Sequence, residues 1–182
     1  MKEEPSALRA KKVNDSKTIM TEMVMPNDTN PSGNLMGGNL LRLMDIVSAI
    51  CAGKHCEANV VTASVDHVSF QLPILVGDVV TLEATVTRAF RTSLEVYVEV
   101  FAANIRGLNN RRCNSAYFTF VALDEENAKP IPAPPVLPLT EIEQQRFESA
   151  PRRRELRLIL SGRMKPENAD GLKAFFQVVS DK

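Results

Sequence analysis

Alternating apolar and polar residues predict three consecutive strands in the middle of the chain. Val79 to Arg88 alternates with a period of two, and Ser93 to Ala102 repeats the pattern. A third strand follows the polar connection RGLNNRRCN, which reads as a hairpin loop, and its inward side chains are Ala116, Phe118, Phe120 and Ala122. These strands predict an antiparallel meander with one apolar face.

A helical period precedes this meander. Apolar residues recur at steps of four, three and four residues, which marks one buried stripe of a helix: Leu40, Met44, Val47 and Cys51. The helix is expected to end near Gly53, followed by a strand from Val60 to Val68, and residues 17–25 predict one further strand. The pattern therefore predicts an α+β fold in which a curved antiparallel sheet wraps around one long helix.

The start of that helix combines residue types that suit hydrolytic chemistry. Turn-forming residues from Pro26 lead to Gly37 and Gly38, which leave the first backbone N–H groups of the helix unobstructed. Those groups carry the positive end of the helix dipole and can hold a developing oxyanion. Asp45 follows about 12 Å further along the axis. The simpler interpretation is that the glycines allow close packing and that Asp45 is a solvated flank residue.

Composition limits the classes of function. The 182 residues are 44% hydrophobic and 24% charged, which predicts one globular core. Lys and Arg total 22 against 22 Asp and Glu, so charge predicts neither a nucleic-acid partner nor a membrane surface. No signal-like or 18-residue apolar segment occurs, and three cysteines without metal-ligand spacing suit a reducing compartment. These features predict a cytoplasmic protein without a metal site.

The composition also divides the chain into segments. We expect a mobile arm at 1–15, the main domain at 16–128, a stiff proline-rich linker (KPIPAPPVLP) at 129–138 and a helical C-terminal extension at 139–182. Thr140 and Glu143 form a capping-box pattern that opens a helix through Phe147. Pro151 is expected to start a second helix, closed by Gly162, and apolar residues from Leu172 to Val179 predict a third.

The loop, the helix and the next strand resemble the signature of a known family. The pattern T-N-x-x-G-x-x-x-G-G-x-x-L-x-x-M-D is matched from Thr29 to Asp45, and VTASVD follows at Val61 to Asp66. This signature is similar to that of the single-domain acyl-CoA thioesterases of the hotdog fold, and the resemblance continues through LPILVGDVV and RTSLEVYVEV over about residues 16–128. Three positions depart from it: Asp28, Leu43 and Ile46 stand where many relatives have His, Trp and an acid.

The resemblance implies an activity and a set of site residues. It implies hydrolysis of acyl-CoA to a carboxylic acid and CoA without a cofactor, with Asp45 as base or nucleophile. Asn30 would position water or polarise the carbonyl, and the N–H of Gly37 or Gly38 would hold the oxyanion. The sequence leaves both a bound anhydride and direct attack by water open. Thr62 and Ser64 would contact the acyl or pantetheine portion, although ordinary polar strand residues are an equal alternative.

The resemblance further implies assembly with copies of itself. In such single-domain relatives Asn30 and Asp45 would act together from different chains of a homodimer, and larger assemblies such as a trimer of dimers follow the same logic. Candidates for binding the CoA phosphates are Arg91, Arg152, Arg153 and Arg154. The alternative for the last three is a solvated helix face.

Three rival functions fit the sequence less well. A serine hydrolase lacks its Gly-x-Ser-x-Gly elbow here, and neither His55 nor His67 has a partner at a readable spacing. A hotdog dehydratase would need a His in the loop before the helix. A module that binds acyl-CoA without turnover remains the alternative from another class, and the presence of both Asn30 and Asp45 favours the enzyme.

Overall fold

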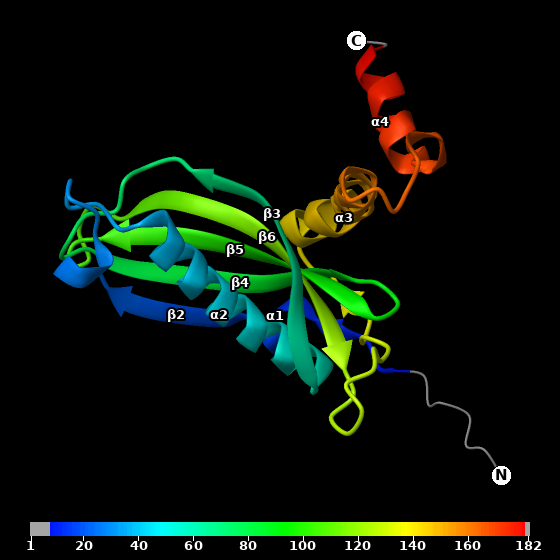
Figure 1. The fold of residues 1–182 in the computed structure, drawn as a ribbon, viewed down its shortest axis with the longest axis horizontal. Helices are drawn as coiled ribbons and strands as arrows, with labels where there is room; N and C mark the ends of the chain where they lie inside the picture. The colour runs from blue at the N-terminus through cyan, green and yellow to red at the C-terminus, as the bar shows by residue number, and fades with distance from the viewer. Residues whose placement is uncertain (1–7, 181–182) are drawn as a thin grey trace. The chain divides into compact units, whose positions relative to one another are not determined.

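Five antiparallel strands form the main sheet of the computed structural model, which describes residues 8–180. The spatial order is β2-β4-β5-β6-β3. The bounds are β2 (Thr18–Met23), β3 (Asn59–Phe70), β4 (Val79–Ala89), β5 (Ser93–Ala103) and β6 (Arg111–Leu123). The long helix α2 (Gly37–Cys56) crosses one face of this sheet (Figure 1). The predicted α+β architecture is therefore confirmed.

The core lies between α2 and the sheet. Met44, Val47 and Cys51 on the predicted stripe are fully buried, as are the inward side chains of β4, β5 and β6. The contacts of α2 reach β3, β4, β5 and β6 because alternate side chains of each strand point to the helix. The helix continues three residues beyond Gly53, and Glu57 ends it in the left-handed conformation (φ 51°).

The edge strand β3 is interrupted by a β-bulge that changes which side chains face the helix. Thr62 is opposite Phe120 of β6, Ser64 is opposite Thr119, and Ala63 is the extra residue between them. Phe120 is a core residue on the helix side, whereas Thr119 alternates with it and lies on the other side. Thr62 and Ser64 consequently face opposite sides of the sheet, although regular alternation would place them together.

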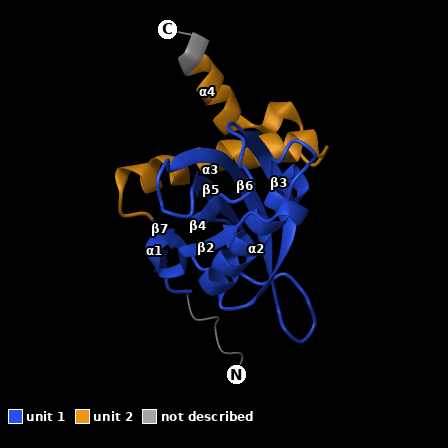
Figure 2. Ribbon diagram, turned by 90° about the vertical axis from the view of Figure 1, so that its left-hand side faces the viewer, with its two compact units in different colours: residues 1–137 blue, residues 138–182 orange. Residues whose placement is uncertain are grey.

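Residues expected to form a mobile arm and a linker contribute to the first unit. Lys11–Lys12 forms β1, which pairs in parallel with β7 (Val136–Leu137), and Val13–Ser16 forms the short helix α1. Prolines lack an N–H donor but keep the carbonyl acceptor. An extended proline-rich segment can therefore still accept hydrogen bonds from the N–H groups of a neighbouring strand. The chain divides into residues 1–137 and 138–182 (Figure 2), which places most of the expected linker inside the first unit.

The second unit contains α3 (Glu141–Leu160), a 3-10 turn (Pro166–Asn168) and α4 (Asp170–Ser180). The Thr140 and Glu143 capping box is present, with the Glu143 N–H 3.3 Å from Thr140 Oγ1. The prediction of two helices divided at Pro151 is wrong, because α3 runs through the proline. Arg153 donates to the carbonyl of Arg146 (2.9 Å), one residue before the carbonyl whose usual donor the proline removes. No helix within residues 8–180 is long and apolar enough to cross a bilayer.

Candidate active site

The N-terminal end of α2 has no cap of its own. Met36 is the N-cap residue, its backbone is extended, and its side chain makes no capping bond. In the described part of the chain, the N–H groups of Gly37 and Gly38 have no hydrogen-bond acceptor. A Cβ on Gly37 would lie 3.3 Å from Cζ of Phe70, whereas one on Gly38 would meet open space. The positive end of the helix is thus accessible, and a Cβ at Gly37 would make the Phe70 ring shift by a few tenths of an ångström.

Asp45 is held in one orientation by Thr62. The Thr62 hydroxyl donates to Asp45 Oδ1 at 2.8 Å, from the edge strand β3 to the half-buried carboxylate on α2. Asp45 Oδ2 has no partner among residues 8–180. The hydroxyl bond fixes the carboxylate plane while the second oxygen stays available to accept a proton or to attack a carbonyl. The structure therefore brings together Asp45 and Thr62 from the sequence-predicted set.

Ser64 does not join this pair. Its Oγ is buried and has no hydrogen-bond partner in the described residues, on the sheet side opposite to α2. The bulge at Ala63 causes this difference, because one extra residue reverses the side to which the next side chains point, up to a second register shift between Asp66 and Ser69. The sequence contains no signal for the bulge, since VTASVD reads as a regular strand.

Asn30 uses its oxygen within its own loop. Asn30 Oδ1 accepts from the N–H groups of Ser32 (3.0 Å) and Asn34 (3.2 Å), and the residue is exposed. This assigns the side-chain NH₂ as the free group, so Asn30 is presented as a donor. The loop is joined to the helix through Asp28, whose carbonyl accepts from the Met36 N–H (2.9 Å) and from Asn39 Nδ2 (3.1 Å). In the described part of one chain, no hydrogen bond joins the side chains of Asn30 and Asp45.

The four candidate arginines lie in both units. Arg91 is exposed in the turn between β4 and β5 of the first unit. In the second unit, the Arg152 guanidinium lies 4.8 Å from the ring centroid of Phe175, and Arg153 donates to Ser149 Oγ at 2.7 Å. Arg154, like the other two, is half-buried on α3. The Arg153 guanidinium therefore already has acceptors within its own helix.

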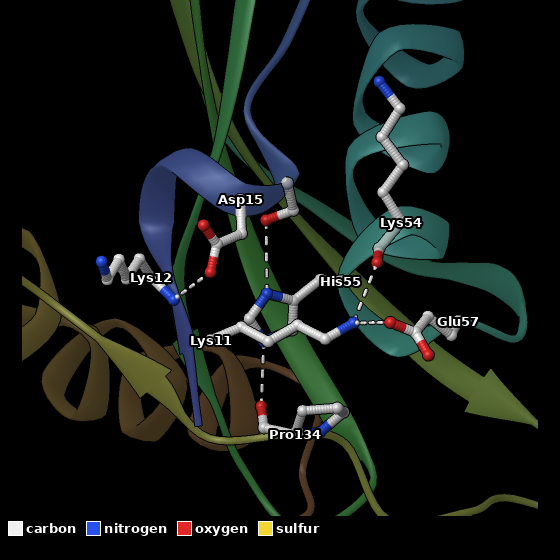
Figure 3. A network of polar contacts seen from close by, with 8 residues as sticks. Lys11, Lys12, Asp15, Lys54, His55, Glu57 and Pro134 are labelled. Carbon is white, nitrogen blue, oxygen red and sulfur yellow. Dashed lines mark hydrogen bonds and ion pairs between the residues drawn. The ribbon is translucent and has the colours of Figure 1, made fainter. Parts of the chain in front are cut away.

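The other end of α2 carries a buried polar network (Figure 3). His55 is fully buried, with Nε2 2.9 Å from the carbonyl of Pro134 and Nδ1 3.3 Å from Ser16 Oγ. A carbonyl only accepts, so Nε2 carries the proton and Nδ1 accepts from Ser16. Burial lowers the pKa of His55, which keeps the ring neutral. Sequence reasoning missed this network because its partners lie 39 and 79 residues away.

Other nucleophiles and metal ligands are not arranged for catalysis. Ser16 is fully buried beside His55, so its hydroxyl is closed to a substrate. Burial raises the pKa of Cys51 to about 12 and that of Cys56 to about 11, which keeps both as thiols at neutral pH. Within residues 8–180 no group of three or more His, Cys, Asp or Glu side chains could hold a metal ion. Ser16, Cys51 and Cys56 are therefore not placed to act as nucleophiles.

This chain is similar in sequence and in fold to known proteins. A sequence profile described as thioesterase superfamily matches residues 32–108. A Bacillus subtilis protein described as an uncharacterized acyl-CoA thioester hydrolase is 41% identical over 129 residues, which are 71% of this chain and 74% of that protein. The crystal structure of a hexameric acyl-CoA thioesterase is 41% identical with a TM-score of 0.81, and the match covers 85% of this chain and 98% of that one.

An acyl-CoA hydrolase of Staphylococcus aureus, described in complex with butyryl-CoA, CoA and CoA disulfide, is 37% identical with a TM-score of 0.78. The match covers 84% of this chain and 94% of that one. Its structure was also determined with alanine in place of one asparagine, one aspartate or one threonine. These three residues have the same spacing along that chain as Asn30, Asp45 and Thr62 have here. By its sequence and its fold, this chain belongs to the acyl-CoA thioesterases of the hotdog fold.

Proposed function

We propose that this protein hydrolyses acyl-CoA thioesters to a carboxylic acid and CoA, without a cofactor. The observation that carries the proposal is the half-buried Asp45 carboxylate, oriented by Thr62 and with one oxygen free. Such a group can activate water or attack the thioester carbonyl directly. The substrates named for the similar hydrolases, butyryl-CoA among them, are acyl-CoA thioesters.

The donors for the oxyanion come from the open end of a helix. An oxyanion donor and a nucleophile that serve one carbonyl lie within about 8 Å of each other, counting about 3 Å on each side of a C=O bond of about 1.2 Å. The Gly37 N–H and Asp45 of one helix are separated by about 12 Å of axial rise. This distance favours a site in which Gly37 or Gly38 of one chain acts with Asp45 of another.

Asn30 belongs with the glycines in this proposal. Its loop is hydrogen-bonded to the start of α2, so the free amide NH₂ moves with the Gly37 and Gly38 N–H groups. The amide can donate to the thioester oxygen or hold the attacking water. Each site would then take Asn30 and the glycines from one chain and Asp45 with Thr62 from the other.

A homodimer formed through β3 would create such sites. β3 is one of the two edge strands of the sheet, and apolar side chains on it and on α2 are exposed: Val61, Val65, Phe70, Ile46 and Ile50. An uncovered edge strand with apolar side chains invites a second strand, and a two-fold axis would pair it with the same strand of another copy. A trimer of these dimers would match the hexameric state of the similar thioesterase.

The proposal also names the arginines that bind the CoA phosphates and the cellular compartment of the protein. Arg91 and the three arginines of α3 are the candidates for the CoA phosphates, through charge-assisted hydrogen bonds. Replacing all three α3 arginines with alanine should then raise KM and weaken the salt dependence of KM, and an unchanged KM would assign them to the helix surface. The three cysteines are free thiols, which suits the cytoplasm.

The direct test is release of free thiol from acyl-CoAs of several chain lengths. A thioesterase releases one CoA thiol for each acid formed, whereas a module that only binds acyl-CoA releases none. If the protein binds CoA but releases thiol from none of the acyl-CoAs, it belongs to the class of modules that bind without turnover.

The bulge provides a matched test of the site. Thr62→Val removes the hydroxyl that orients Asp45 and should lower kcat about tenfold or more, because one hydrogen bond to the carboxylate is lost. Ser64→Ala removes a hydroxyl two residues away on the other side of the sheet and should leave kcat unchanged. Equal effects of the two changes would contradict the positioning role of Thr62.

A further inference from the structure

The two helices of the second unit, α3 and α4, pack against each other and leave large apolar side chains exposed (Figure 2). Leu156 and Leu160 of α3 and Phe175 and Phe176 of α4 are between 44% and 79% exposed. Arg152, Leu156 and Leu160 recur every four residues and therefore lie on one side of α3. Since the Arg152 guanidinium lies 4.8 Å from the Phe175 ring centroid, that side of α3 is next to α4. We name the four exposed side chains the apolar patch.

The helix α4 is amphipathic, and its apolar side is the one that remains exposed. Leu172, Phe175 and Phe176 share one side of the helix, whereas Lys173 and Gln177 share the other. A helix of a globular protein usually packs its apolar side on a core. Both phenylalanines of α4 are exposed instead. An apolar surface of this kind marks a place where another molecule binds.

Basic residues are concentrated beside the apolar patch. Residues 152–165 contain six Arg and Lys side chains and one acid, Glu155. The Glu155 carboxylate accepts from the N–H groups of Gly171 (3.3 Å) and Leu172 (2.9 Å), so its charge is directed at the positive start of α4. The whole chain, by contrast, has equal numbers of basic and acidic residues. The second half of α3 and the turn after it are therefore a local positive surface.

This charge decides between two occupants of the apolar patch. If the patches of two copies paired about a two-fold axis, each basic segment would approach its equivalent, and like charges repel. A bilayer with anionic headgroups offers acyl chains to the leucines and phenylalanines and negative phosphates to the cations. Amphipathic helices that lie on such a surface combine the same two kinds of side chain.

We propose that α3 and α4 bind the protein to an anionic lipid surface. The apolar patch enters the boundary between headgroups and acyl chains, and the cations of residues 152–165 contact the headgroup phosphates. A helix that lies along the surface does this without crossing the bilayer. Binding of this kind does not depend on thioesterase activity, so it can be measured whether or not the protein releases thiol.

Co-sedimentation of the full chain with lipid vesicles tests the proposal. One set of vesicles mixes phosphatidylglycerol with phosphatidylcholine, and the other contains phosphatidylcholine alone. The wild type should bind the anionic vesicles at least tenfold more tightly than the neutral ones, and added salt should weaken the binding to anionic vesicles. Equal binding to both sets, or binding to neither, would overturn the proposal.

The apolar contribution is tested with two matched double variants. Leu160→Gln with Phe176→Gln reduces the apolar patch and should weaken binding to anionic vesicles about tenfold. Ile105→Gln with Leu108→Gln changes two apolar side chains of the turn between β5 and β6 in the first unit, and it should bind as the wild type does. All four side chains are more than half exposed, so both variants should keep the fold. Equal effects of the two variants would contradict a role of the apolar patch.

A second pair of variants tests the charge and keeps the proposal falsifiable if the first pair does not fold. Arg163→Gln with Lys165→Gln should weaken binding to anionic vesicles about tenfold and reduce its salt dependence. Residues 152–154 stay unchanged in this variant because they are candidates for the CoA phosphates. Arg106→Gln with Lys129→Gln, which changes two exposed cations of the first unit, is the control. Wild-type binding by Arg163→Gln with Lys165→Gln would overturn the proposal.

The state of assembly separates the lipid surface from a second copy of the chain. Analytical ultracentrifugation without vesicles compares the wild type with Leu160→Gln, Phe176→Gln. The two proteins should have the same molar mass, because the apolar patch is free until lipid is added. A smaller assembly in the variant would assign the apolar patch to contacts between copies and overturn the proposal.

Discussion

The two ends of α2 are built in opposite ways. At the C-terminal end, Lys11 donates to the carbonyl of Lys54 (3.2 Å) and pairs with Glu57 (2.7 Å), and His55 joins two other segments (Figure 3). At the N-terminal end no side chain caps the helix, and the Gly37 and Gly38 N–H groups have no acceptor in the described residues. Protein groups bind at one end of the helix, whereas the first N–H groups at the other end have no acceptor among the described residues.

This difference separates stability from function along a single helix. A cation at the negative end of the helix dipole, here the Lys11 ammonium on the Lys54 carbonyl, stabilises the fold. Unsatisfied N–H groups at the positive end lower stability but can bind a developing negative charge. Changes at the open end should therefore alter turnover, and changes at the closed end should alter stability.

The largest expected effect comes from the Asp45 carboxylate, near the middle of α2. Asp45→Asn keeps the shape and the acceptor for Thr62 but is neither a base nor a nucleophile, so kcat should fall about 100- to 10,000-fold. Glu57→Gln, at the closed end of the same helix, is the matched control and should keep the wild-type kcat. Thiol release from a saturating acyl-CoA measures both, and near-normal turnover in Asp45→Asn would remove it from the mechanism.

Mixed dimers test whether Asn30 and Asp45 of one site come from two different chains. Asn30→Ala and Asp45→Ala chains, each inactive alone, are refolded together, so that one site of a mixed dimer contains both changes and the other contains neither. Random pairing makes about half of the dimers mixed, and about a quarter of wild-type activity should return under two-fold symmetry. No recovery in tagged, purified mixed dimers would show that each site uses residues of one chain only.

A new cap should make the two ends of the helix more alike. Met36→Ser places a hydroxyl at the N-cap position, where it can accept from the N–H of Gly38 or Asn39. Stability should rise by about 0.5–2 kcal/mol while kcat falls several-fold, because the hydroxyl competes with the oxyanion. Met36→Ala removes the same side chain without adding an acceptor. A rise in melting temperature with unchanged kcat would mean that these N–H groups do not contact the substrate.

The smallest effect is expected at the closed end and concerns pH. Burial lowers the pKa of His55 in the folded chain, so below the unfolded value of about 6.5 the unfolded chain takes up the proton first. The contribution to stability is complete above that value and is lost as the pH falls below it. His55→Gln should flatten the dependence of melting temperature on pH in this range, whereas His67→Asn, which leaves the network intact, should retain it. An equally steep dependence in His55→Gln would assign the acid sensitivity to other groups.

Local patterns were sufficient to predict most of the sheet and the long helix. Strands β4, β5 and β6 alternate over most of their length because one face is packed on α2, although β-bulges interrupt β4 at Thr87 and β6 at Cys113. Met44, Val47 and Cys51 form the stripe that the helical period predicts. The resemblance also placed Asp45 and Thr62 in the two elements that the structure brings into contact. These features depend on residues that are near each other in the sequence or share one period.

The features that could not be predicted depend on distant partners or on a single extra residue. The bulge at Ala63 separates Thr62 from Ser64, and nothing in the composition of β3 distinguishes it from a regular strand. His55 is buried by Ser16 and Pro134 from other segments, and Pro151 remains inside α3 while Arg153 donates to a nearby carbonyl. The burial of His55 was decided by contacts with distant segments, and the continuation of α3 through Pro151 is accompanied by a side-chain bond within that helix. Local propensity contains neither of these.

The parallel pairing of β1 with β7 brings the beginning and the end of the first unit together, since Lys11 is the ladder partner of Val136. A short peptide could therefore join these two points and close the unit into a ring without bending the sheet. New termini could be opened at the exposed turn around Gly107, between β5 and β6. The unit is thus suited to circular permutation, in which the order of its strands along the chain changes while the Asp45 carboxylate keeps its surroundings.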